Sequence, residues 1–471
     1  MKPEQFDLAI VGAGAAGLIA ADLALQLRAR TVLLERERIG GDCTWSGCVP
    51  SKALVKAAAV AAGVRGAARF GIRADQTRVE FAHVHEYLRS CVQRIYAPTA
   101  PEALRARGLE VRMGAARFVD AHTLEVAGQP LQARRILICT GARPREPALP
   151  GLDRVPHLTY RQIFEHERLP QSLIVVGGGP LGCEIAQSYG RLGSRVTLLA
   201  PRLLPRVEPE AAELLSGVFA AEGLEHRRAR ALAARCDGEH VQVRTEQGEL
   251  GAERLLIAVG RVPDVADLAL ERAGVRHSER GIEVNARLQT SARHIYAAGD
   301  VLGGAQFSHL AGWQAFHAVR NALLPGGGSA LASTLPEVTF TDPEVAHVGL
   351  TEAQARARFG ARVQAGRIDL AHVDRAVSED DRTGLIKLVA HRDGRILGAT
   401  VMAARGGEAL TEIGLAICHR LTLRDLAAAI HPYPTYNSAK QLLATRMATA
   451  RAFAGARGAL TRALSRWTLR T

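Results

Sequence analysis

Apolar and polar positions follow the same order in two separate parts of the chain. Between residues 6 and 35, an apolar run is followed by a glycine-rich turn, an alanine-rich stretch and a second apolar run. This order predicts a strand, a turn, a helix and a second strand, and it is found again from residue 171 to 200. Strands that alternate with helices are typical of parallel sheets covered by helices, so the pattern indicates an α/β protein with an internal repeat.

The turn of the first copy has glycine at the three positions of a dinucleotide-binding fingerprint. Gly12 permits the tight turn, Gly14 lets a pyrophosphate approach the backbone, and Gly17 lets the helix pack closely on the strand. The phosphates then lie at the positive N-terminus of the helix. Glu35 ends the second predicted strand, where a carboxylate can bind a ribose 2′-hydroxyl. These residues predict a Rossmann-like domain for a dinucleotide with a free 2′-hydroxyl, such as FAD.

The second copy has the same three glycines, Gly177, Gly179 and Gly182. Two complete copies are much stronger evidence than one glycine-rich turn, so we expect the chain to bind two dinucleotides. The residue that corresponds to Glu35 is Ala200, and Arg202 and Arg206 follow it. The loss of a carboxylate and the nearby cations favour a 2′-phosphate, so we predict NADPH rather than NADH, with Arg202 at the phosphate. The alternative is that both arginines only face solvent.

Two cysteines lie in the glycine-rich segment that follows the first repeat, residues 40–52. Pro50 favours a helix start, which places Cys48 at or just before a helix N-terminus. There the helix dipole and Lys52 both stabilise a thiolate. A thiol of low pKa separated by four residues from Cys43 is the arrangement that dithiol–disulfide exchange needs.

Other uses of the seven cysteines have less support. Zinc would need a second Cys or His pair with suitable spacing, which the sequence lacks, so we predict no metal site. A disulfide framework is not expected without a secretory signal. The remaining five cysteines stand in apolar surroundings and are predicted to be inert core residues: Cys91, Cys139, Cys183, Cys236 and Cys418.

Length and charge narrow the class of protein further. The 471 residues indicate about three domains. The net charge of +13 comes from arginines spread along the chain, without basic blocks interleaved with aromatics, so nucleic-acid binding is not expected. No run of about 18 uninterrupted apolar residues occurs, which argues against a spanning helix. The apolar N-terminus lacks a basic leader, and we expect a cytoplasmic protein.

The cysteine segment, Gly-Gly-x-Cys-x4-Cys-x-Pro-Ser-Lys, resembles that of the class I pyridine nucleotide-disulfide oxidoreductases. That family includes glutathione reductase, lipoamide dehydrogenase and mercuric reductase. Further segments resemble the family's motifs in the same order along nearly the whole chain: Thr140-Gly141, residues 258–263 with Arg261, Ala298-Gly299-Asp300 and residues 340–351.

The resemblance implies an α/β protein with two Rossmann-like domains, for FAD and NAD(P)H, and a C-terminal α+β dimerisation domain. It therefore also implies a homodimer. The implied limits are 1–148 for the first FAD segment, 149–264 for the NAD(P)H domain, 265–333 for the second FAD segment and 334–471 for the dimerisation domain.

The resemblance also implies roles for individual residues. Cys48 would be the sulfur next to the flavin and form a charge-transfer thiolate, and Cys43 would exchange with the substrate. Lys52 and Glu184 would form an ion pair beside the flavin. The alternative for Glu184 is an acid in the first turn of a helix, where the dipole favours it. The family's FAD contacts correspond here to Thr140, Gly141, Gly299 and Asp300.

The C-terminal motif departs from that of the thiol-disulfide members. They carry a His-Pro-Thr segment followed by Glu, a pair that shuttles protons to substrate thiols. Here Tyr433 stands at the His position and Ser438 at the Glu position, with His431 two residues upstream. A phenol, with a pKa of about 10, is a poor shuttle at neutral pH. A Pro-Tyr-x-Thr segment instead resembles mercuric reductase, where the tyrosine lines the metal site of the partner subunit.

These features predict an FAD-dependent oxidoreductase that passes electrons from NADPH through FAD to the Cys43–Cys48 disulfide and on to a small acceptor. The acceptor would be a soft metal ion, a quinone or a disulfide; soft metals bind thiolate sulfur directly and need no proton shuttle. Mercuric reductase itself ends with paired cysteines, whereas the last cysteine here is Cys418. The alternatives are a dihydrolipoamide-dehydrogenase-like enzyme and a flavin-bound redox sensor or membrane-associated electron carrier.

Residues 439–471 form an alanine-rich stretch in which arginines recur between leucines and Trp467. The pattern predicts an amphipathic helix that could lie on an anionic membrane surface. The alternative is a solvated helix whose apolar side packs on the dimer, and the sequence favours this second interpretation.

Overall fold

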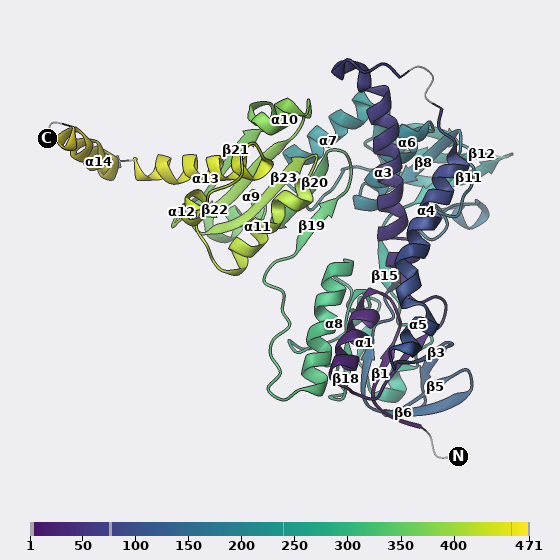
Figure 1. Cartoon of the computed structure of the whole chain (residues 1–471). Coiled ribbons are helices and arrows are strands. Elements are labelled where there is room, and N and C mark those ends of the chain that lie inside the picture. Colours follow the sequence, from purple (N-terminus) through teal and green to yellow (C-terminus); the bar gives the residue numbers. More distant parts are fainter. Residues whose placement is uncertain (1–3, 75–77, 239, 454, 470–471) are drawn as a thin grey trace. The chain divides into compact units, whose positions relative to one another are not determined.

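Both glycine-rich turns lie between a strand and a helix, as the sequence predicts. The computed structural model describes residues 4–74, 78–238, 240–453 and 455–469. In the first copy, β1 (Glu4–Val11) leads into α1 (Ala15–Gln26), and β2 (Thr31–Glu35) pairs with β1 in parallel. In the second copy, β8 (Ser172–Val176) leads into α6 (Pro180–Leu192) and then into β9 (Arg195–Leu199) (Figure 1).

The chain divides into two compact units. The first comprises residues 1–177, 191–196 and 229–331, and the second comprises residues 178–190, 197–228 and 332–471. The finer division at residues 148, 264 and 333 stays a prediction.

The main sheet of the first unit is built around β1. Its strand order is β3-β2-β1-β6-β5-β4, and β18 also pairs with β6. The other strands of this sheet are β3 (Glu110–Met113), β4 (Ala116–Phe118), β5 (Thr123–Val126), β6 (Gln129–Ile138) and β18 (Ile295–Ala297). Because β1 lies inside the sheet, the side chains from Leu8 to Val11 are buried on both faces, which explains the continuous apolar run.

Two alanine-rich helices pack against each other in this unit, α1 and α8 (Ser308–Leu323) (Figure 1). Ala20, Ala24, Ala315 and Ala318 are fully buried in the same apolar cluster. Small side chains let helix axes come close, so the alanine-rich stretch after Gly17 reflects this packing.

An apolar helical stretch from Gly41 to Arg65 contains α2 (Gly41–Trp45) and α3 (Cys48–Arg65). Among the described residues it is the one stretch that is long and apolar enough to cross a membrane. The sequence prediction overlooked it because polar residues interrupt its apolar run. One face of α3, with Leu54 and Ala58, is buried in the protein, as expected of a core helix.

Smaller elements complete the first unit. Its other helices are α4 (Phe81–Tyr96) and α5 (Pro101–Ala106). The strand β14 (Arg254–Ile257) pairs in parallel with β8, and β11 (Ala231–Asp237), β12 (His240–Thr245) and β13 (Gly248–Ala252) form an antiparallel sheet. Two ribbons pair β7 (Ala142–Pro144) with β15 (Arg261–Pro263) and β16 (His277–Ser278) with β17 (Gly281–Ile282).

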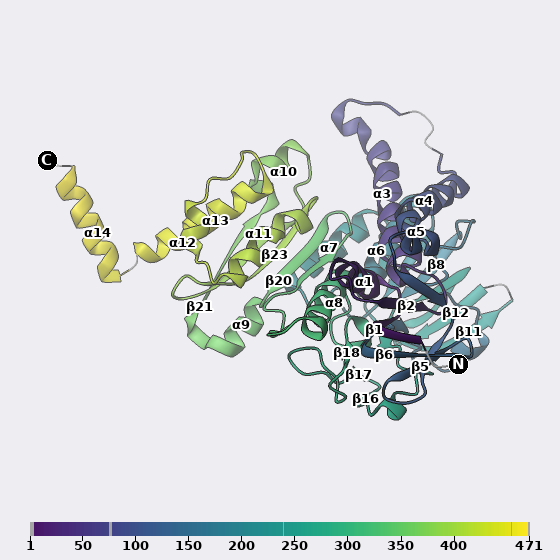
Figure 2. The same ribbon diagram turned by 60° about the horizontal axis from the view of Figure 1, so that its bottom comes forward.

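The second unit contains the predicted α+β domain, an antiparallel sheet of order β19-β20-β23-β22-β21. Its strands are β19 (Pro336–Thr339), β20 (Glu344–Gly349), β21 (Val363–Asp369), β22 (Leu385–His391) and β23 (Ile396–Ala403). Every residue of the central strand β23 is buried, because α11 (Gly406–Cys418) and α13 (Tyr436–Ala452) pack on the sheet (Figure 2). The other helices of this unit are α7 (Pro209–Ala221), α9 (Glu352–Phe359), α10 (Asp374–Ser378), α12 (Leu423–Ala428) and α14 (Gly455–Thr468), and β10 (Glu225–Arg227) pairs with β9.

Candidate active site

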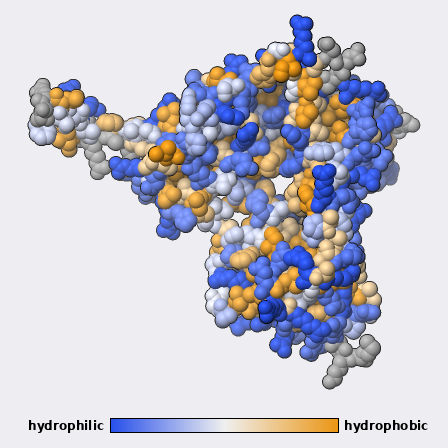
Figure 3. All heavy atoms as spheres, viewed as in Figure 1, coloured by the Kyte–Doolittle hydropathy of each residue, from blue (hydrophilic) through white to orange (hydrophobic). Residues whose placement is uncertain are grey.

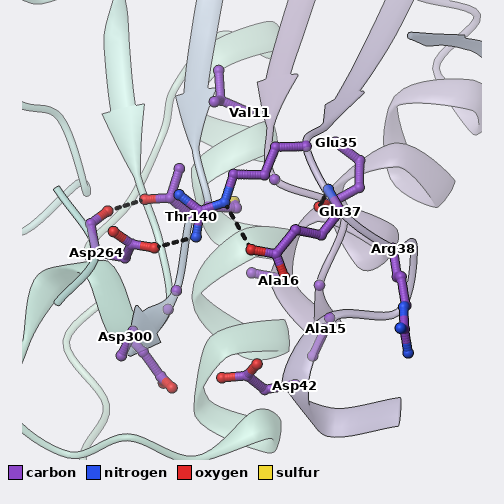
Figure 4. Close-up of a pocket in the computed structure, with 18 of the residues that line it drawn as sticks. Val11, Ala15, Ala16, Glu35, Glu37, Arg38, Asp42, Thr140, Asp264 and Asp300 are labelled. Carbon is purple, nitrogen blue, oxygen red and sulfur yellow. Dashed lines mark hydrogen bonds and ion pairs between the residues drawn. The ribbon is translucent and has the colours of Figure 1, made fainter. Parts of the chain in front are cut away.

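A cavity of about 490 Å³ opens in the first unit where several parallel strands end. Its walls include the residues that directly follow β1, β2, β6 and β18. Ligands of open α/β sheets bind at this edge, because the loops at the carboxyl ends of the strands converge there. Figure 4 shows side chains from these separate segments around the same space.

The glycine turn after β1 presents its backbone to the cavity. A Cβ added at Gly12 would lie 2.4 Å from the carbonyl oxygen of Cys139, so no other residue fits there. Gly17 is equally restricted, since its Cβ would lie 1.9 Å from the carbonyl oxygen of Gly12. Gly14 lines the cavity, and α1 begins directly after it. The turn thus offers backbone N–H groups at a helix N-terminus, which suits a diphosphate.

Glu35 lies at the end of β2 and also lines the cavity. Its carboxylate accepts hydrogen bonds from the backbone N–H groups of Ala13 and Glu37, each at 2.8 Å. The side chain therefore fixes the glycine turn to the loop after β2 (Figure 4). A carboxylate at this position can accept hydrogen bonds from ribose hydroxyls and repels a 2′-phosphate.

Thr140 and Gly141 follow β6 and form another part of the wall. The Thr140 hydroxyl donates to the backbone carbonyl of Asp264 at 2.7 Å, and the Asp264 carboxylate pairs with Arg36 at 2.7 Å (Figure 4). Gly141 has a φ of +75°, a left-handed conformation that favours glycine. The contacts of Asp264 with Thr140 and Arg36 thus hold this part of the wall next to Glu35, where the ribose is expected.

A charged network that the sequence did not predict connects three segments of the wall. Arg261 donates to the carboxylates of Asp42 and Asp300, each at 2.5 Å. The Tyr160 hydroxyl donates to Asp42 at 2.6 Å, and burial raises the pKa of Tyr160 to about 12. Arg161 lies 3.6 Å from Asp42, and its Nε is buried without a hydrogen-bond partner among the described residues. The sequence indicated Arg261 only as part of a motif. It did not predict the pairing with Asp42 and Asp300, because these residues are distant from Arg261 in the sequence.

The two cysteines of the motif lie next to each other at the cavity. Cys43 belongs to α2 and lines the cavity, and Cys48 is the first residue of α3, the helix position that the sequence predicts. The Cys48 thiol is 3.1 Å from the hydroxyl of Ser308, which also lines the cavity. A hydrogen bond to Cys48, burial and the charge of Cys48 all raise the pKa of Cys43.

The other five cysteines follow the prediction only in part. Cys139 and Cys183 are fully buried, and burial raises the pKa of both thiols. Cys91 is half-buried, whereas Cys236 and Cys418 are exposed, so the prediction of core positions is wrong for these two. Cys236 lies on an edge strand, β11, and Cys418 is the last residue of α11, with its thiol 3.1 Å from the Thr334 hydroxyl.

Lys52 and Glu184 lie in different units, and their ion pair stays a prediction. In the first unit, Lys52 is half-buried and donates to the Ser51 hydroxyl at 3.3 Å. In the second unit, Glu184 is buried and accepts a hydrogen bond from the Phe340 N–H at 2.9 Å. Because α6 begins at Pro180 and has no acid in its first turn, the first-turn explanation of Glu184 is wrong.

The second glycine turn repeats the steric feature of the first. A Cβ added at Gly177 would lie 2.3 Å from the carbonyl oxygen of Ala258, the counterpart of the contact at Gly12. Gly179 directly precedes α6, and Gly182 lies within it.

Two arginines that follow β9 and β10 line a small cavity of about 60 Å³ in the second unit, Arg202 and Arg228. His226 also lines it, with its ring held between the Ser216 hydroxyl and a backbone carbonyl. Arg228 pairs with Glu213, which also lines this cavity, and Arg206 pairs with Glu337 at 3.1 Å. The sequence did not predict a role for Arg228, because this residue follows a short strand outside the repeated unit.

His431 is held at both ring nitrogens within the second unit. Nε2 lies 2.7 Å from the Glu412 carboxylate and Nδ1 lies 2.9 Å from the carbonyl oxygen of Ala429. Glu412 also accepts from the fully buried Lys440 at 2.9 Å. His431 therefore belongs to an internal cluster with Glu412 and Lys440, and both of its ring nitrogens have hydrogen-bond partners within the second unit.

Tyr433 and Ser438 do not form a shuttle. Tyr433 is 74% exposed, and its hydroxyl donates to Asp374 at 2.6 Å, an interaction that raises the pKa of the phenol. Ser438 exchanges hydrogen bonds with the backbone of Thr435 at the start of α13. At the position of the family's histidine the described part of this segment thus has an exposed phenol, and its imidazole–carboxylate pair is the one between His431 and Glu412.

Two family models match the chain. Residues 6–315 match the pyridine nucleotide-disulphide oxidoreductase model, and residues 335–444 match the dimerisation domain of the same family. A mercuric reductase of Streptomyces lividans is 39% identical over 455 residues, which cover 93% of this chain and 95% of that protein. A dihydrolipoyl dehydrogenase of Thermus scotoductus is 35% identical over 444 residues, covering 92% and 95%.

Solved structures agree with these sequence matches. The HOCl-induced flavoprotein disulfide reductase RclA of Escherichia coli has a TM-score of 0.83 at 28% identity, covering 93% of this chain and 99% of that one. LpdA of Mycobacterium tuberculosis has a TM-score of 0.84 at 28% identity, covering 94% and 99%. Because the family model matches most of the chain, the chain belongs to the pyridine nucleotide-disulphide oxidoreductases, enzymes that use FAD and NAD(P)H.

Proposed function

We propose that this chain is an FAD-containing reductase that passes electrons from NADPH through the Cys43–Cys48 pair to a soft metal ion. Two features together carry the proposal. Two adjacent thiols lie at the cavity, and the histidine of the C-terminal segment has hydrogen-bond partners at both ring nitrogens. Such a site offers two sulfur ligands, whereas the ring nitrogens of His431 are engaged in hydrogen bonds within the second unit.

The residues around the 490 Å³ cavity fit FAD. The turn from Gly12 to Gly14 offers backbone donors for the diphosphate, and Glu35 suits the ribose. Arg161 lines the same cavity with a buried Nε that lacks a partner among the described residues, as expected of a group that awaits an anion. The chemistry that FAD supplies when bound is two-electron transfer between a nicotinamide and the cysteine pair.

The cysteine pair then needs little help from other side chains. Reduction of the disulfide takes up two electrons and two protons and gives two thiols. Loss of both protons gives two thiolates that bind a soft metal ion through sulfur. Exchange with a disulfide substrate needs an acid near neutral pKa instead. Tyr433, with its raised pKa, does not meet that requirement.

The relatives support a metal acceptor. Several are named mercuric reductase, and RclA has been solved as a Cu(II) complex. For the nicotinamide, Arg202 and Arg228 beside one small cavity support NADPH, because two cations favour a 2′-phosphate. The match to the family's dimerisation domain supports a homodimer.

The proposal is tested by steady-state reduction of several acceptors with NADPH and with NADH. Mercuric and cupric ions are compared with lipoamide, glutathione disulfide and a quinone. We expect a metal ion to be reduced fastest, and Cys43→Ser to lower that rate about a hundredfold or more, because the sulfur pair is lost. Cys236→Ser is the matched control, since this exposed thiol lies outside the cavity-lining residues.

Three outcomes would contradict the proposal. Metal reduction that is insensitive to Cys43→Ser would mean that electrons leave without the sulfur pair. Fastest turnover with lipoamide would favour the dihydrolipoyl dehydrogenase alternative. Slow turnover with every acceptor would favour a redox sensor or electron carrier.

A further inference from the structure

The chain continues past the end of the family's dimerisation domain. The match to that domain ends at residue 444, within α13. The helix α13 is anchored in the core of the second unit by three buried side chains, Leu443, Ala444 and Met447. A separate helix, α14 (Gly455–Thr468), follows it. The family fold therefore does not require α14.

One side of α14 is apolar and unpacked in the chain. Every side chain from residue 459 to 469 is exposed. Leu460, Leu464 and Trp467 stand at spacings of four and three residues, which puts them on one face of the helix. Their exposed fractions are 62%, 54% and 67%. Arg462 and Arg466 lie on the opposite side, and Figure 3 shows hydrophobic and hydrophilic residues together on this helix.

The charge of this part of the chain has a single sign. From residue 426 to 471 the sequence contains no Asp or Glu. It contains seven cations, Lys440, Arg446, Arg451, Arg457, Arg462, Arg466 and Arg470. Such a segment is complementary to an anionic surface, because no internal carboxylates neutralise it.

We propose that α14 binds the surface of a membrane that contains anionic lipid. Its leucines and Trp467 enter the boundary between headgroups and acyl chains, and its arginines bind lipid phosphates. The sequence pattern alone favours a helix that packs on the dimer, and the proposal differs from that interpretation. A second copy of the chain is itself cationic, with a net charge of +13, and gives a basic helix no electrostatic reason to dock.

Nucleic acid is a weaker match for the same helix. A phosphate backbone would explain the arginines and leave the leucine and tryptophan stripe exposed. A membrane interface uses both faces, since tryptophan is enriched at the headgroup level. The proposal is independent of the terminal electron acceptor.

The test is co-sedimentation of the full-length, FAD-loaded protein with vesicles. Vesicles of phosphatidylcholine alone are compared with vesicles that also contain phosphatidylglycerol, at low and at high salt. We expect binding only to the anionic vesicles, weakened by salt. Arg462→Glu/Arg466→Glu should weaken that binding at least about tenfold, since two attractive charges become repulsive. Trp467→Ala should weaken it about fivefold or more through loss of apolar burial.

The matched control is Arg134→Glu/Arg293→Glu, the same change of charge at two exposed positions of the first unit. It should bind anionic vesicles like the unchanged protein, and the flavin spectrum checks that each variant is folded. Full recovery of the unchanged protein in the supernatant overturns the proposal. So does a helix-dependent change in oligomeric state without vesicle binding, which would assign α14 to a second copy. Binding to a DNA duplex but not to vesicles would assign it to nucleic acid.

Discussion

Arg261 connects two segments of the cavity wall that are distant in the sequence. It donates to Asp42, next to Cys43, and to Asp300, beside Gly299. Burial raises the pKa of Asp300, and Arg261 opposes that rise. One guanidinium thus pairs with two carboxylates and holds together the segments that would enclose the flavin's ribityl chain and the redox cysteines.

Replacement of Arg261 should therefore weaken FAD binding in a pH-dependent way. In Arg261→Leu we expect FAD affinity to fall about 10- to 100-fold at pH 8, because two neighbouring carboxylates lose their counter-charge. At pH 5 the loss should be smaller, since Asp300 without Arg261 has a higher pKa and takes up a proton more readily. The FAD affinity at each pH is measured from the fluorescence of released FAD. Arg143→Leu is the control, because Arg143 is exposed and lies on β7, the strand that pairs with the strand of Arg261; equal FAD affinity in both variants would contradict the role of Arg261.

A buried lysine joins three elements of the second unit. Lys387 of β22 is 6% exposed and pairs with Glu208 and Glu210 at the start of α7 and with Glu352 at the start of α9, at 2.8–3.0 Å. Burial lowers the pKa of Lys387, but the three hydrogen-bonded carboxylates outweigh burial and raise it. The two helix N-termini are thus tied to the sheet by one cation.

Lys387→Met should destabilise the second unit by about 3–5 kcal/mol, because Glu208 stays buried without a counter-charge. Glu210→Gln is the control and should cost about 1 kcal/mol or less, since Glu210 is 39% exposed. Lys387 lowers the pKa of Glu352, so the stabilisation is present above the ordinary value of about 4.5 and is lost as the pH falls through the lowered pKa. Denaturant unfolding at pH 7 and pH 3 measures both effects. Equal stability of the two variants at pH 7 would contradict this account.

Local signals predicted the strands and helices well, and they failed where partners are distant in sequence. The glycine spacing predicted both strand–turn–helix units, and Pro50 predicted the start of α3 at Cys48. The pairing of Asp42 with Arg261 spans 219 residues, and no periodicity reports it. The same limit applies to the exposure of Cys236, which depends on its place at the edge of a sheet.

The assembled protein is expected to build each site from two copies of the chain. The redox cysteines lie in the first unit and Tyr433 in the second, and the chain carries the family's dimerisation domain. Tyr433 is 74% exposed, so its ring is available to a partner. From the resemblance to mercuric reductase we expect this tyrosine to lie at the metal site of the other subunit. In a symmetric dimer, two sites then form, each with cysteines from one copy and a tyrosine from the other.

Mixed dimers test this arrangement directly. Cys43→Ser and Tyr433→Ala should each lose most metal reduction when produced alone. Co-expression of the two in equal amounts should restore about a quarter of the unmodified activity, because half of the dimers are mixed and each mixed dimer has one intact site. Cys43→Ser with Cys48→Ser is the control, since both changes fall on the same half of the site and every mixed dimer stays inactive. If the tyrosine mixture recovers no more than this control, Tyr433 does not act across the dimer.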